Sequence, residues 1–277
     1  MTRIVVLGSN GWFGDKVYQF FGDDSIAIPG SKVRALLSSN SSQKALISLL
    51  KETDDTKIIN CIGSRYGNLS QMQSANIDVP IKISEIASSL GLYLCHIGSA
   101  AEYGVCAMGS RLSESSIASP TTAYGKSKLT GSLKVLKNST SLVLRIFNVV
   151  HSNLPPKNPL VDIQLKVHSA PLHSDAIKLL NAFTTRDYIS LGFTLNTLKF
   201  VLSNRTTGVL NVCSGTPIQL GDIAREIARR VKYSSIVKSE LNDQRDYVVG
   251  DSTKLQSVTG LYEEANPSKV VDWLAGH

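Results

Sequence analysis

The stretch Ile4-Val5-Val6-Leu7-Gly8-Ser9-Asn10-Gly11-Trp12-Phe13-Gly14 decides the fold of this chain. Its apolar residues predict a buried strand that ends at Leu7, and a helix is expected to begin near Gly11. Glycines at such a junction permit a tight turn, let backbone amides approach an anion, and let the helix pack closely on the sheet. The helix N-terminus adds free N–H groups and a partial positive charge. The pattern predicts a site for a dinucleotide pyrophosphate, although a glycine-rich turn in another α/β protein is the alternative.

Short apolar runs and amphipathic segments alternate through the first half of the chain. Such alternation is typical of a parallel sheet covered by helices on both faces. The predicted fold class is therefore α/β, with a Rossmann-type doubly wound parallel sheet. The expected strands cover 3–8, 25–29, 33–37, 57–62, 92–98 and 141–146. The expected helices cover 11–21, 42–52, 71–90 and 121–137.

A proline-rich stretch, Asn153-Leu154-Pro155-Pro156-Lys157-Asn158-Pro159, interrupts this alternation. It marks a boundary, so residues 1–152 are expected to form a dinucleotide-binding domain and 153–277 mainly a second part. The later segments mix short strands with helices, for example 219–231. No internal repeat, low-complexity tract or long linker is present in the sequence.

Tyr124 and Lys128 are four residues apart in Tyr124-Gly125-Lys126-Ser127-Lys128. On a helix this spacing places both side chains on one face. Free tyrosine has a pKa of about 10, and a nearby ammonium group favours the phenolate and lowers that pKa. General acid–base catalysis works best when the pKa approaches the working pH, so the pair is a candidate for proton transfer. An ordinary amphipathic helix with a surface lysine would show the same spacing.

Ser99 follows the apolar run Leu92-Tyr93-Leu94-Cys95-His96-Ile97-Gly98, which predicts a buried strand. In open α/β sheets, ligands bind outside the carboxyl ends of the strands. A hydroxyl there can hydrogen-bond a carbonyl oxygen or an alkoxide, whereas a serine that merely ends a strand in a turn is the alternative. Taken with the glycine loop and the tyrosine–lysine pair, Ser99 completes a pattern that predicts hydride chemistry on an alcohol or a ketone.

The composition bounds the class of protein. The chain has 277 residues and is 42% hydrophobic, which is enough for a sizeable core. No apolar run approaches the roughly 18 residues of a membrane span, and the first strand follows Met1 too closely for a signal peptide. The four cysteines include no Cys-x-x-Cys pair, which favours reduced thiols. We therefore expect a cytoplasmic protein with no membrane partner.

The net charge of +7 fits a cofactor and a substrate that both carry phosphates, and it fits a solvated basic surface equally well. The sequence has no dense lysine–arginine block and no aromatic residues interleaved with basic ones. A nucleic-acid partner is therefore not expected. A metal site is not expected either.

These motifs together resemble the extended short-chain dehydrogenase/reductase family, in particular its nucleotide-sugar epimerase, dehydratase and reductase members. The resemblance covers nearly the whole chain. In the first half it rests on the glycine loop and on Asn60-Cys61-Ile62-Gly63-Ser64, Asn76, Gly98-Ser99-Ala100-Ala101-Glu102-Tyr103-Gly104 and Leu144-Arg145-Ile146-Phe147-Asn148-Val149. In the second half it rests on Arg186-Asp187-Tyr188-Ile189, 208–215, Gln244-Arg245-Asp246 and Asp251-Ser252-Thr253-Lys254.

The resemblance implies three sets of site residues. The implied catalytic residues are Ser99, Tyr124 and Lys128. The implied cofactor-binding residues are Gly8, Asn10, Gly11, Trp12, Phe13, Gly14, Ser31, Lys32, Arg34, Cys61, Ile62, Gly63, Asn76, Tyr124 and Lys128. The implied substrate-binding residues are Ser99, Ala100, Ala101, Asn148, Arg186 and Arg245.

The resemblance also bears on organisation and partners. It implies that a segment near 186–215 rejoins the first domain, that the remainder of 153–277 forms a smaller C-terminal substrate-binding lobe, and that the protein is a homodimer. Arg186 and Arg245 would contact the diphosphate of a nucleotide-sugar substrate, because the planar guanidinium pairs two oxygens at once. A surface ion pair is the alternative for each arginine.

The cofactor's identity depends on the end of the second expected strand. Family members that prefer NAD usually carry an acidic residue there for the ribose 2′-hydroxyl. This chain has Pro29-Gly30-Ser31-Lys32-Val33-Arg34 instead. A serine with two cations suits a 2′-phosphate, so NADP(H) is favoured over NAD(H). The alternative is that Lys32 and Arg34 face water.

The residues after Ser99 discriminate between reactions. Dehydratase relatives carry an Asp-Glu pair where this chain has Ala100 and Ala101, and epimerase-reductases of the GDP-fucose type carry a cysteine at the Ala101 position. Alanine cannot transfer a proton, so both reactions are disfavoured. The favoured reaction is reduction of a 4-keto sugar, with a 4-epimerase as the alternative. A non-catalytic cofactor-sensing or RNA-associated regulator is less favoured, because a retired site has no chemical reason to keep Ser99, Tyr124 and Lys128.

Overall fold

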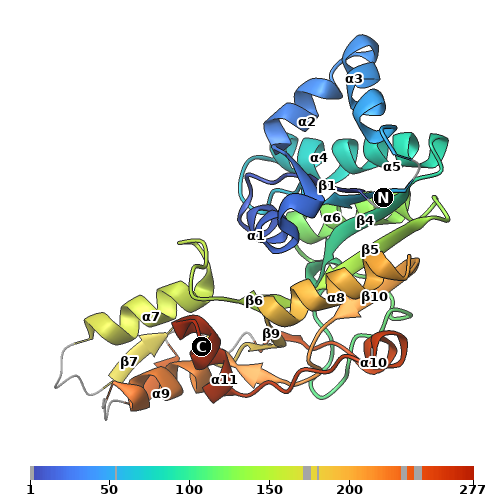
Figure 1. The fold of residues 1–277 in the computed structure, drawn as a ribbon. Helices are drawn as coiled ribbons and strands as arrows, with labels where there is room; N and C mark the ends of the chain where they lie inside the picture. Colours follow the sequence, from blue (N-terminus) through green and yellow to red (C-terminus); the bar gives the residue numbers. More distant parts are fainter. Residues whose placement is uncertain (1–2, 54, 171–175, 180, 232–235, 240–244) are drawn as a thin grey trace. The chain divides into compact units, whose positions relative to one another are not determined.

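The computed structural model describes residues 3–53, 55–170, 176–179, 181–231, 236–239 and 245–277. The chain divides into two compact units, whose elements are drawn in Figure 1. The first unit comprises Met1–Gly104, Ile117–Ile146 and Leu195–Leu210. The second unit comprises Val105–Ser116, Phe147–Thr194 and Asn211–His277. The segment that returns to the first unit is therefore Leu195–Leu210.

A six-stranded sheet, with the order β10-β5-β4-β3-β1-β2, is the largest in the described part of the chain. Its strands are β1 (Arg3–Leu7), β2 (Ser25–Ile28), β3 (Thr56–Asn60), β4 (Tyr93–Ser99), β5 (Ser141–Ile146) and β10 (Gly208–Val212). Strands β1 to β5 pair in parallel. The chain places β2 on one side of β1 and β3 on the other, so the topological switch point lies between β1 and β3. This arrangement confirms the predicted Rossmann-type fold class.

Helices flank the sheet in the first unit. They are α1 (Trp12–Phe21), η1 (Gly22–Asp24), α2 (Gly30–Leu36), α3 (Asn40–Leu50), α4 (Leu69–Gln73), η2 (Ser74–Asp78), α5 (Val79–Ser89), η3 (Ala100–Glu102) and α6 (Ala123–Val135). Helix α8 (Leu191–Ser203) begins in the second unit and continues into the first from Leu195. Side-chain caps begin several of them: Ser39 caps α3 and Thr122 caps α6. Apolar residues from both layers, such as Ile58 and Leu94 in the sheet and Ile83 on α5, form one core.

The strand expected over 33–37 is wrong, because this segment forms helix α2. The run Val33-Arg34-Ala35-Leu36-Leu37 is largely apolar, but only Val33 and Leu37 are buried. That i, i+4 spacing is the period of a helix rather than of a strand. The helix begins after Pro29, whose carbonyl oxygen accepts a hydrogen bond from Val33 N at 3.0 Å. The sheet consequently ends at β2 on this side.

The single helix expected over 71–90 is interrupted by a π turn, η2. Pro80 has no N–H, so it cannot donate to the carbonyl of Asn76 four residues earlier. The Val79 N–H instead bonds Ser74 O, five residues back. Helix α6 meets this turn through Gly131, where a Cβ would lie 2.0 Å from Asn76 O. The turn is therefore built into the packing of α6.

The second unit contains three small sheets and four helices among its described residues. The sheets are β11-β8-β13, β12-β7 and β6-β9. Their strands are β6 (Asn148–Val150), β7 (Ala176–Leu179), β8 (Thr185–Arg186), β9 (Tyr188–Ser190), β11 (Ile218–Gln219), β12 (Ile236–Ser239) and β13 (Tyr247–Val248). The helices are α7 (Pro159–Ser169), α9 (Leu220–Arg230), α10 (Thr253–Thr259) and α11 (Pro267–Ala275).

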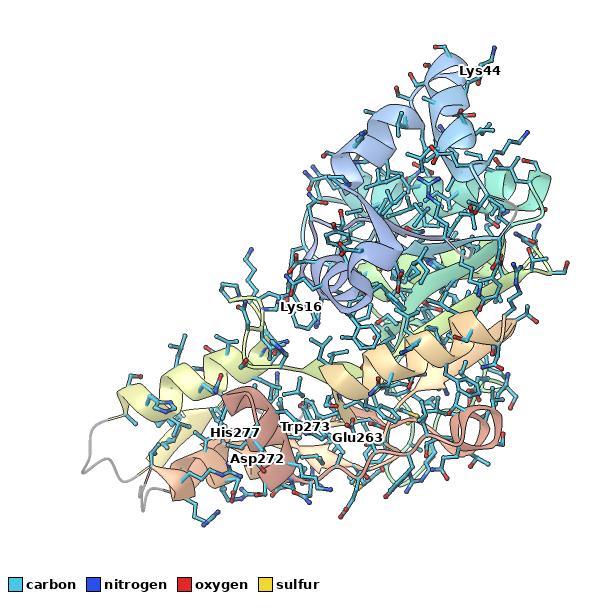
Figure 2. The ribbon with its side chains drawn as sticks, in the orientation of Figure 1. Lys16, Lys44, Glu263, Asp272, Trp273 and His277 are labelled. Atoms are coloured by element: carbon cyan, nitrogen blue, oxygen red, sulfur yellow. The ribbon has the colours of Figure 1, made fainter. Side chains whose placement is uncertain are left out.

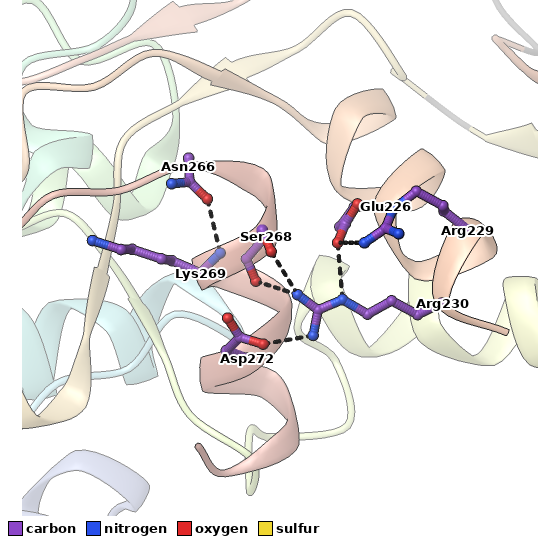
Figure 3. A network of polar contacts seen from close by, with 7 residues as sticks. All are labelled: Glu226, Arg229, Arg230, Asn266, Ser268, Lys269 and Asp272. Carbon is purple, nitrogen blue, oxygen red and sulfur yellow. Dashed lines mark hydrogen bonds and ion pairs between the residues drawn. The ribbon is translucent and has the colours of Figure 1, made fainter.

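Arg230 joins helices α9 and α11 within the second unit (Figure 3). Its guanidinium donates to Asp272 Oδ1 at 2.6 Å, to Glu226 Oε1 at 2.9 Å and to Ser268 Oγ at 2.8 Å. Asp272 lies on α11, and Glu263 precedes that helix (Figure 2). Glu263 accepts from Ser190 N at 2.7 Å, which ties the same region to β9. A charge network and a half-buried carboxylate thus hold α11 in place.

All four cysteines predicted to be reduced are free thiols. Among the described residues, none of the helices combines the length and the apolar character needed to cross a membrane.

Asp187 is the polar centre of the second unit. Its carboxylate is fully buried, and Oδ1 accepts from Ser214 N at 2.9 Å and from Ser214 Oγ at 2.7 Å. Oδ2 accepts from Gly215 N at 2.9 Å and Gly250 N at 3.1 Å. Burial raises the pKa of Asp187 to about 6, while these four donors act to lower it. One side chain therefore joins three segments that are distant in sequence.

We predict that Asp187→Asn destabilises the second unit. An amide offers one acceptor oxygen, and its NH₂ group would face the backbone N–H donors that the carboxylate now binds. Each buried N–H left without a partner costs about 1–3 kcal/mol. Urea denaturation followed by circular dichroism should give a lower free energy of unfolding. The matched control is Asp222→Asn on α9. It removes an exposed ion pair with Arg225, and such a pair contributes about 1 kcal/mol or less to stability. Equal stability of the two variants would contradict the assignment.

Candidate active site

The glycine loop after β1 is built by backbone contacts that exclude side chains. Gly8 has φ +91°, a left-handed conformation that favours glycine. Gly8 N donates to Ile28 O at 2.8 Å, and Gly11 N donates back to Gly8 O at 3.0 Å. A Cβ on Gly14 would lie 2.2 Å from Gly8 O. Gly8 and Gly14 are therefore required by the turn itself.

Gly11 differs from Gly8 and Gly14, because the turn does not require a glycine at position 11. Its φ of −82° suits any residue, and a Cβ there would contact only Gly8 O, at 3.4 Å. Gly11 is exposed and precedes helix α1, whose N-terminus has no side-chain cap. Uncapped N–H groups at a helix N-terminus form an anion site. This end of α1 fits a pyrophosphate group.

The loop contacts both neighbouring strands at their carboxyl ends. Asn10 Oδ1 accepts from Gly30 N at 2.8 Å, which ties the loop to the start of α2. Cys61 N donates to Leu7 O at 2.9 Å, and a Cβ on Gly8 would lie 2.9 Å from Ile62 Cγ1. The predicted residues Gly8, Asn10, Cys61 and Ile62 thus meet at the switch point, where ligands of open α/β sheets bind. Trp12 and Phe13 follow as the half-buried first residues of α1.

Ser31, Lys32 and Arg34 are exposed on α2, directly after β2. A Cβ on Gly30 would lie 3.6 Å from Arg34 Nη1 and 3.6 Å from Asn10 Oδ1. The Arg34 guanidinium is therefore directed back toward the loop.

Asn76 holds the segment after β3 against helix α6. It is fully buried; its Oδ1 accepts from Ser64 N at 2.8 Å, and its Nδ2 donates to Ser127 Oγ at 2.9 Å. Ser127 Oγ donates in turn to Tyr124 O at 2.8 Å. Gly63 lies beside the same amide, since a Cβ there would be 3.3 Å from Asn76 Oδ1. The amide of Asn76 is thus committed to protein groups that position Tyr124.

Ser99 and Tyr124 come together at the end of β4. The two side chains face each other there, close enough for the Ser99 hydroxyl to affect the pKa of the Tyr124 phenol. Burial raises the pKa of Tyr124, while the Ser99 hydroxyl and the charge of Arg65 lower it. Gly125 permits this approach, because a Cβ there would lie 2.3 Å from Ala101 O. Ala100 and Ala101 form the short helix η3 between the two catalytic candidates.

Glu102 positions the backbone of Ser99. The sequence analysis assigned no role to this residue. It is fully buried, and its Oε1 accepts from Ser99 N at 2.9 Å and from Ser132 Oγ at 2.9 Å. Its Oε2 accepts from Arg145 Nε at 2.9 Å, and that guanidinium lies 4.3 Å from the Tyr103 ring centroid. The spacing Ser99-Ala100-Ala101-Glu102 is that of a capping box, which is the sequence signal that reveals this contact.

Lys128 is buried one turn after Tyr124. Its Nζ donates to Ile97 O at 2.5 Å and lies 3.3 Å from His96 Nε2. Burial lowers the pKa of Lys128, and the charges of Glu102 and Cys61 act to raise it. His96 was also missed, because a histidine within an apolar strand has no sequence signature.

The remaining predicted substrate residues belong to the second unit. Asn148 Nδ2 donates to Asp187 O at 2.8 Å. Arg186 is paired with Asp246 Oδ2 at 3.3 Å, and the Arg245 guanidinium lies 5.8 Å from the Phe183 ring centroid. Arg186 is half-buried and Arg245 exposed. The structure thus brings the catalytic and cofactor candidates together in one unit, whereas these three residues lie in the other.

Comparisons with known proteins agree with this fold. No family model matches the chain. One curated relative, dTDP-6-deoxy-L-talose 4-dehydrogenase (NAD(P)(+)) of Kitasatospora kifunensis, is 28% identical over 265 residues, which cover 87% of this chain and 82% of the relative.

Solved structures are similar over almost the whole chain. The enzyme WbmG of Bordetella bronchiseptica, in complex with NAD and UDP, gives a TM-score of 0.81 at 19% identity and covers 99% of this chain and 94% of its own. RMD of Pseudomonas aeruginosa, complexed with NADPH, gives a TM-score of 0.80 at 19% identity and covers 99% of each chain. Together with the curated relative, they confirm the resemblance to the nucleotide-sugar group of extended short-chain dehydrogenases/reductases.

We predict that Gly11→Val keeps the fold and weakens cofactor binding. Valine suits the extended backbone at this position but occupies the space in front of the α1 N-terminus. Loss of one hydrogen bond to a charged group costs about 1.5–3 kcal/mol, which corresponds to a dissociation constant roughly tenfold to a hundredfold higher. Fluorescence titration with NADPH and thermal unfolding measure the two effects. Gly14→Ala is the contrast, since its Cβ clash should lower stability. Unchanged affinity in Gly11→Val would show that the loop does not bind the pyrophosphate.

Proposed function

We propose that this chain is an NAD(P)-dependent oxidoreductase that acts on a nucleotide-linked sugar, and that its reaction is reduction of a 4-keto group. The observation that carries the proposal is the approach of the Ser99 hydroxyl to the Tyr124 phenol in the unit that also holds the glycine loop. A proton donor and a carbonyl-binding hydroxyl are thus paired beside a site suited to a dinucleotide.

The chemistry assigns one task to each catalytic residue. A bound nicotinamide supplies the hydride. Ser99 hydrogen-bonds the sugar carbonyl oxygen, and Tyr124 donates its phenolic proton to that oxygen. Lys128 holds the ribose hydroxyls of the cofactor. Because burial raises the pKa of Tyr124, the phenol keeps its proton at neutral pH. A protonated tyrosine suits reduction, in which it acts as the acid.

The substrate class rests on residues of both units. Arg186 and Arg245 would bind the substrate diphosphate, and Asn148 the sugar. Alanines at 100 and 101 provide no acid or base for elimination of water. The curated relative is a 4-dehydrogenase of a dTDP-linked 6-deoxy sugar, and its name supports net redox chemistry at C4.

NADP(H) is the cofactor we propose. Lys32 and Arg34 are exposed after β2, and Arg34 is directed toward the glycine loop. A charge-assisted contact with a 2′-phosphate is open to both side chains. Of the two fold neighbours, one was solved with NAD and the other with NADPH.

The test is a turnover assay with dTDP-, GDP- and UDP-linked 4-keto sugars, each with NADPH and with NADH. A reductase consumes one reduced nicotinamide for each 4-keto group that it converts to a hydroxyl group. We expect a lower KM for NADPH than for NADH. A 4-epimerase would interconvert two nucleotide sugars without net change in absorbance. An RNA filter-binding assay on the same preparation covers the non-catalytic alternative. Tight cofactor binding with no turnover on any sugar would reject the reductase.

We predict that Tyr124→Phe lowers kcat by about 10²–10⁴-fold, the usual contribution of a general acid. Phenylalanine fills the same space but has no proton to donate, so the affinity for NADPH should stay near that of the wild type. Steady-state kinetics and cofactor titration measure the two quantities. Tyr262→Phe, which changes an exposed tyrosine of the second unit, is the control and should leave kcat unchanged. Near-normal turnover in Tyr124→Phe would refute the mechanism.

A further inference from the structure

Lys128 is held in a buried polar cluster with two residues to which the proposed reaction assigns no role. The cluster comprises Asn60 at the end of β3, His96 in β4 and Lys128 on α6. Asn60 and His96 are fully buried, and Lys128 is 3% exposed. The three side chains form a chain of contacts in which His96 is the middle member. Asn60 Nδ2 is 3.1 Å from His96 Nδ1, and His96 Nε2 is 3.3 Å from Lys128 Nζ.

The backbone fixes which atoms donate in this cluster. Ile62 N donates to Asn60 Oδ1 at 3.1 Å, so the oxygen of that amide faces the backbone and its NH₂ group faces the imidazole. An amide NH₂ can only donate, and His96 Nδ1 must therefore accept. A neutral imidazole with an accepting Nδ1 carries its proton on Nε2. The hydrogen bonds thus assign the His96 tautomer.

The tautomer has a consequence for Lys128. The Nε2–H bond of His96 is directed at Lys128 Nζ, and an ammonium group has no lone pair to accept it. Two donors would then face each other in a buried site. A neutral amine resolves the conflict, because it accepts from His96 Nε2 while it donates to Ile97 O.

We propose that Asn60 and His96 are positioning residues that hold Lys128 as a neutral amine in the cofactor-free chain, so that cofactor binding is coupled to uptake of one proton by Lys128. This inference rests on the proposed role of Lys128 in holding the ribose hydroxyls. On binding, Nζ would leave His96 Nε2, gain a proton from solvent and become an ammonium group.

The groups around Lys128 support the neutral form. On the β4 side, burial holds the pKa of His96 well below its usual value, so the ring is uncharged. After β3, burial raises the pKa of Cys61 to about 12, which leaves a neutral thiol at pH 8–9. On η3, Glu102 acts to raise the pKa of Lys128, but its carboxylate is paired with Arg145 at 2.9 Å. On α6 itself, Tyr124 keeps its proton because its pKa is raised.

The experiment is calorimetric titration of the full-length protein with NADPH at pH 8–9 in two buffers of different ionisation enthalpy. A phosphate monoester has a second pKa of about 6, so the 2′-phosphate of NADPH contributes no proton in this range. We expect uptake that approaches one proton per cofactor bound. Binding without a buffer-dependent enthalpy would overturn the inference, whereas absence of binding would instead reject the proposed function.

The discriminating variant is Asn60→Asp. One carboxylate oxygen can still accept from Ile62 N, and the other accepts from Nδ1–H of His96, which moves the imidazole proton to Nδ1. The Nε2 lone pair then faces Lys128 and stabilises its ammonium form before binding. Proton uptake should fall close to zero while NADPH still binds. Asn266→Asp, the N-cap of α11 where aspartate serves equally well, is the matched control and should retain wild-type uptake. Equal uptake in all three proteins would contradict the proposal.

A second measurement needs no variant. The ¹⁵N shifts of the wild-type imidazoles, recorded without cofactor, identify the unprotonated nitrogen of each ring. For His96 we expect that nitrogen to be Nδ1. An unprotonated Nε2 would overturn the inference even if Asn60→Asp failed to fold.

Discussion

Helix α6 lies in direct contact with two backbone carbonyl oxygens, and the candidate active site depends on that contact. A Cβ on Gly125 would lie 2.3 Å from Ala101 O, and one on Gly131 would lie 2.0 Å from Asn76 O. Only glycine allows the helix backbone to approach so closely. The first contact sets Tyr124 beside Ser99, and the second sets Ser127 on Asn76. Tyr124 and Lys128 are thereby fixed by the backbone rather than by their own flexible side chains.

Two buried polar contacts, Glu102–Arg145 and Asn60–His96, lie next to the catalytic candidates in this frame. Glu102 and Arg145 form an ion pair that also holds the Ser99 backbone. Because desolvation of both charges offsets their attraction, a buried pair of this kind contributes little net stability, and here it fixes the position of the backbone. The Asn60–His96 contact acts on Lys128 in the same way, through the direction of its hydrogen bonds. Groups arranged before substrate arrives need no reorganisation during the reaction, which is the main source of electrostatic catalysis.

The sequence predicted features that depend on neighbouring residues and missed those that depend on distant ones. The glycine loop, the strand that ends at Ser99 and the tyrosine–lysine spacing are local patterns, and the elements that carry them lie where they were expected. The strand expected over 33–37 is a helix, because an apolar run of five residues suits either element and only packing decides between them. His96 was counted as part of an apolar strand. Its partners Asn60 and Lys128 lie 36 and 32 positions away in the sequence, and no single-sequence pattern joins them.

The division into two units separates the residues of the proposed proton chemistry from those of the proposed substrate recognition. Ser99, Tyr124 and Lys128 belong to the first unit, while Arg186 and Arg245 belong to the second. Asp187, next to Arg186, ties its own segment to two others of that unit through one buried carboxylate. Under the proposed function, a change of sugar or nucleotide would alter contacts of the second unit, whereas the proposed proton-transfer groups belong to the first. Such a separation would let one scaffold serve several nucleotide-sugar reactions.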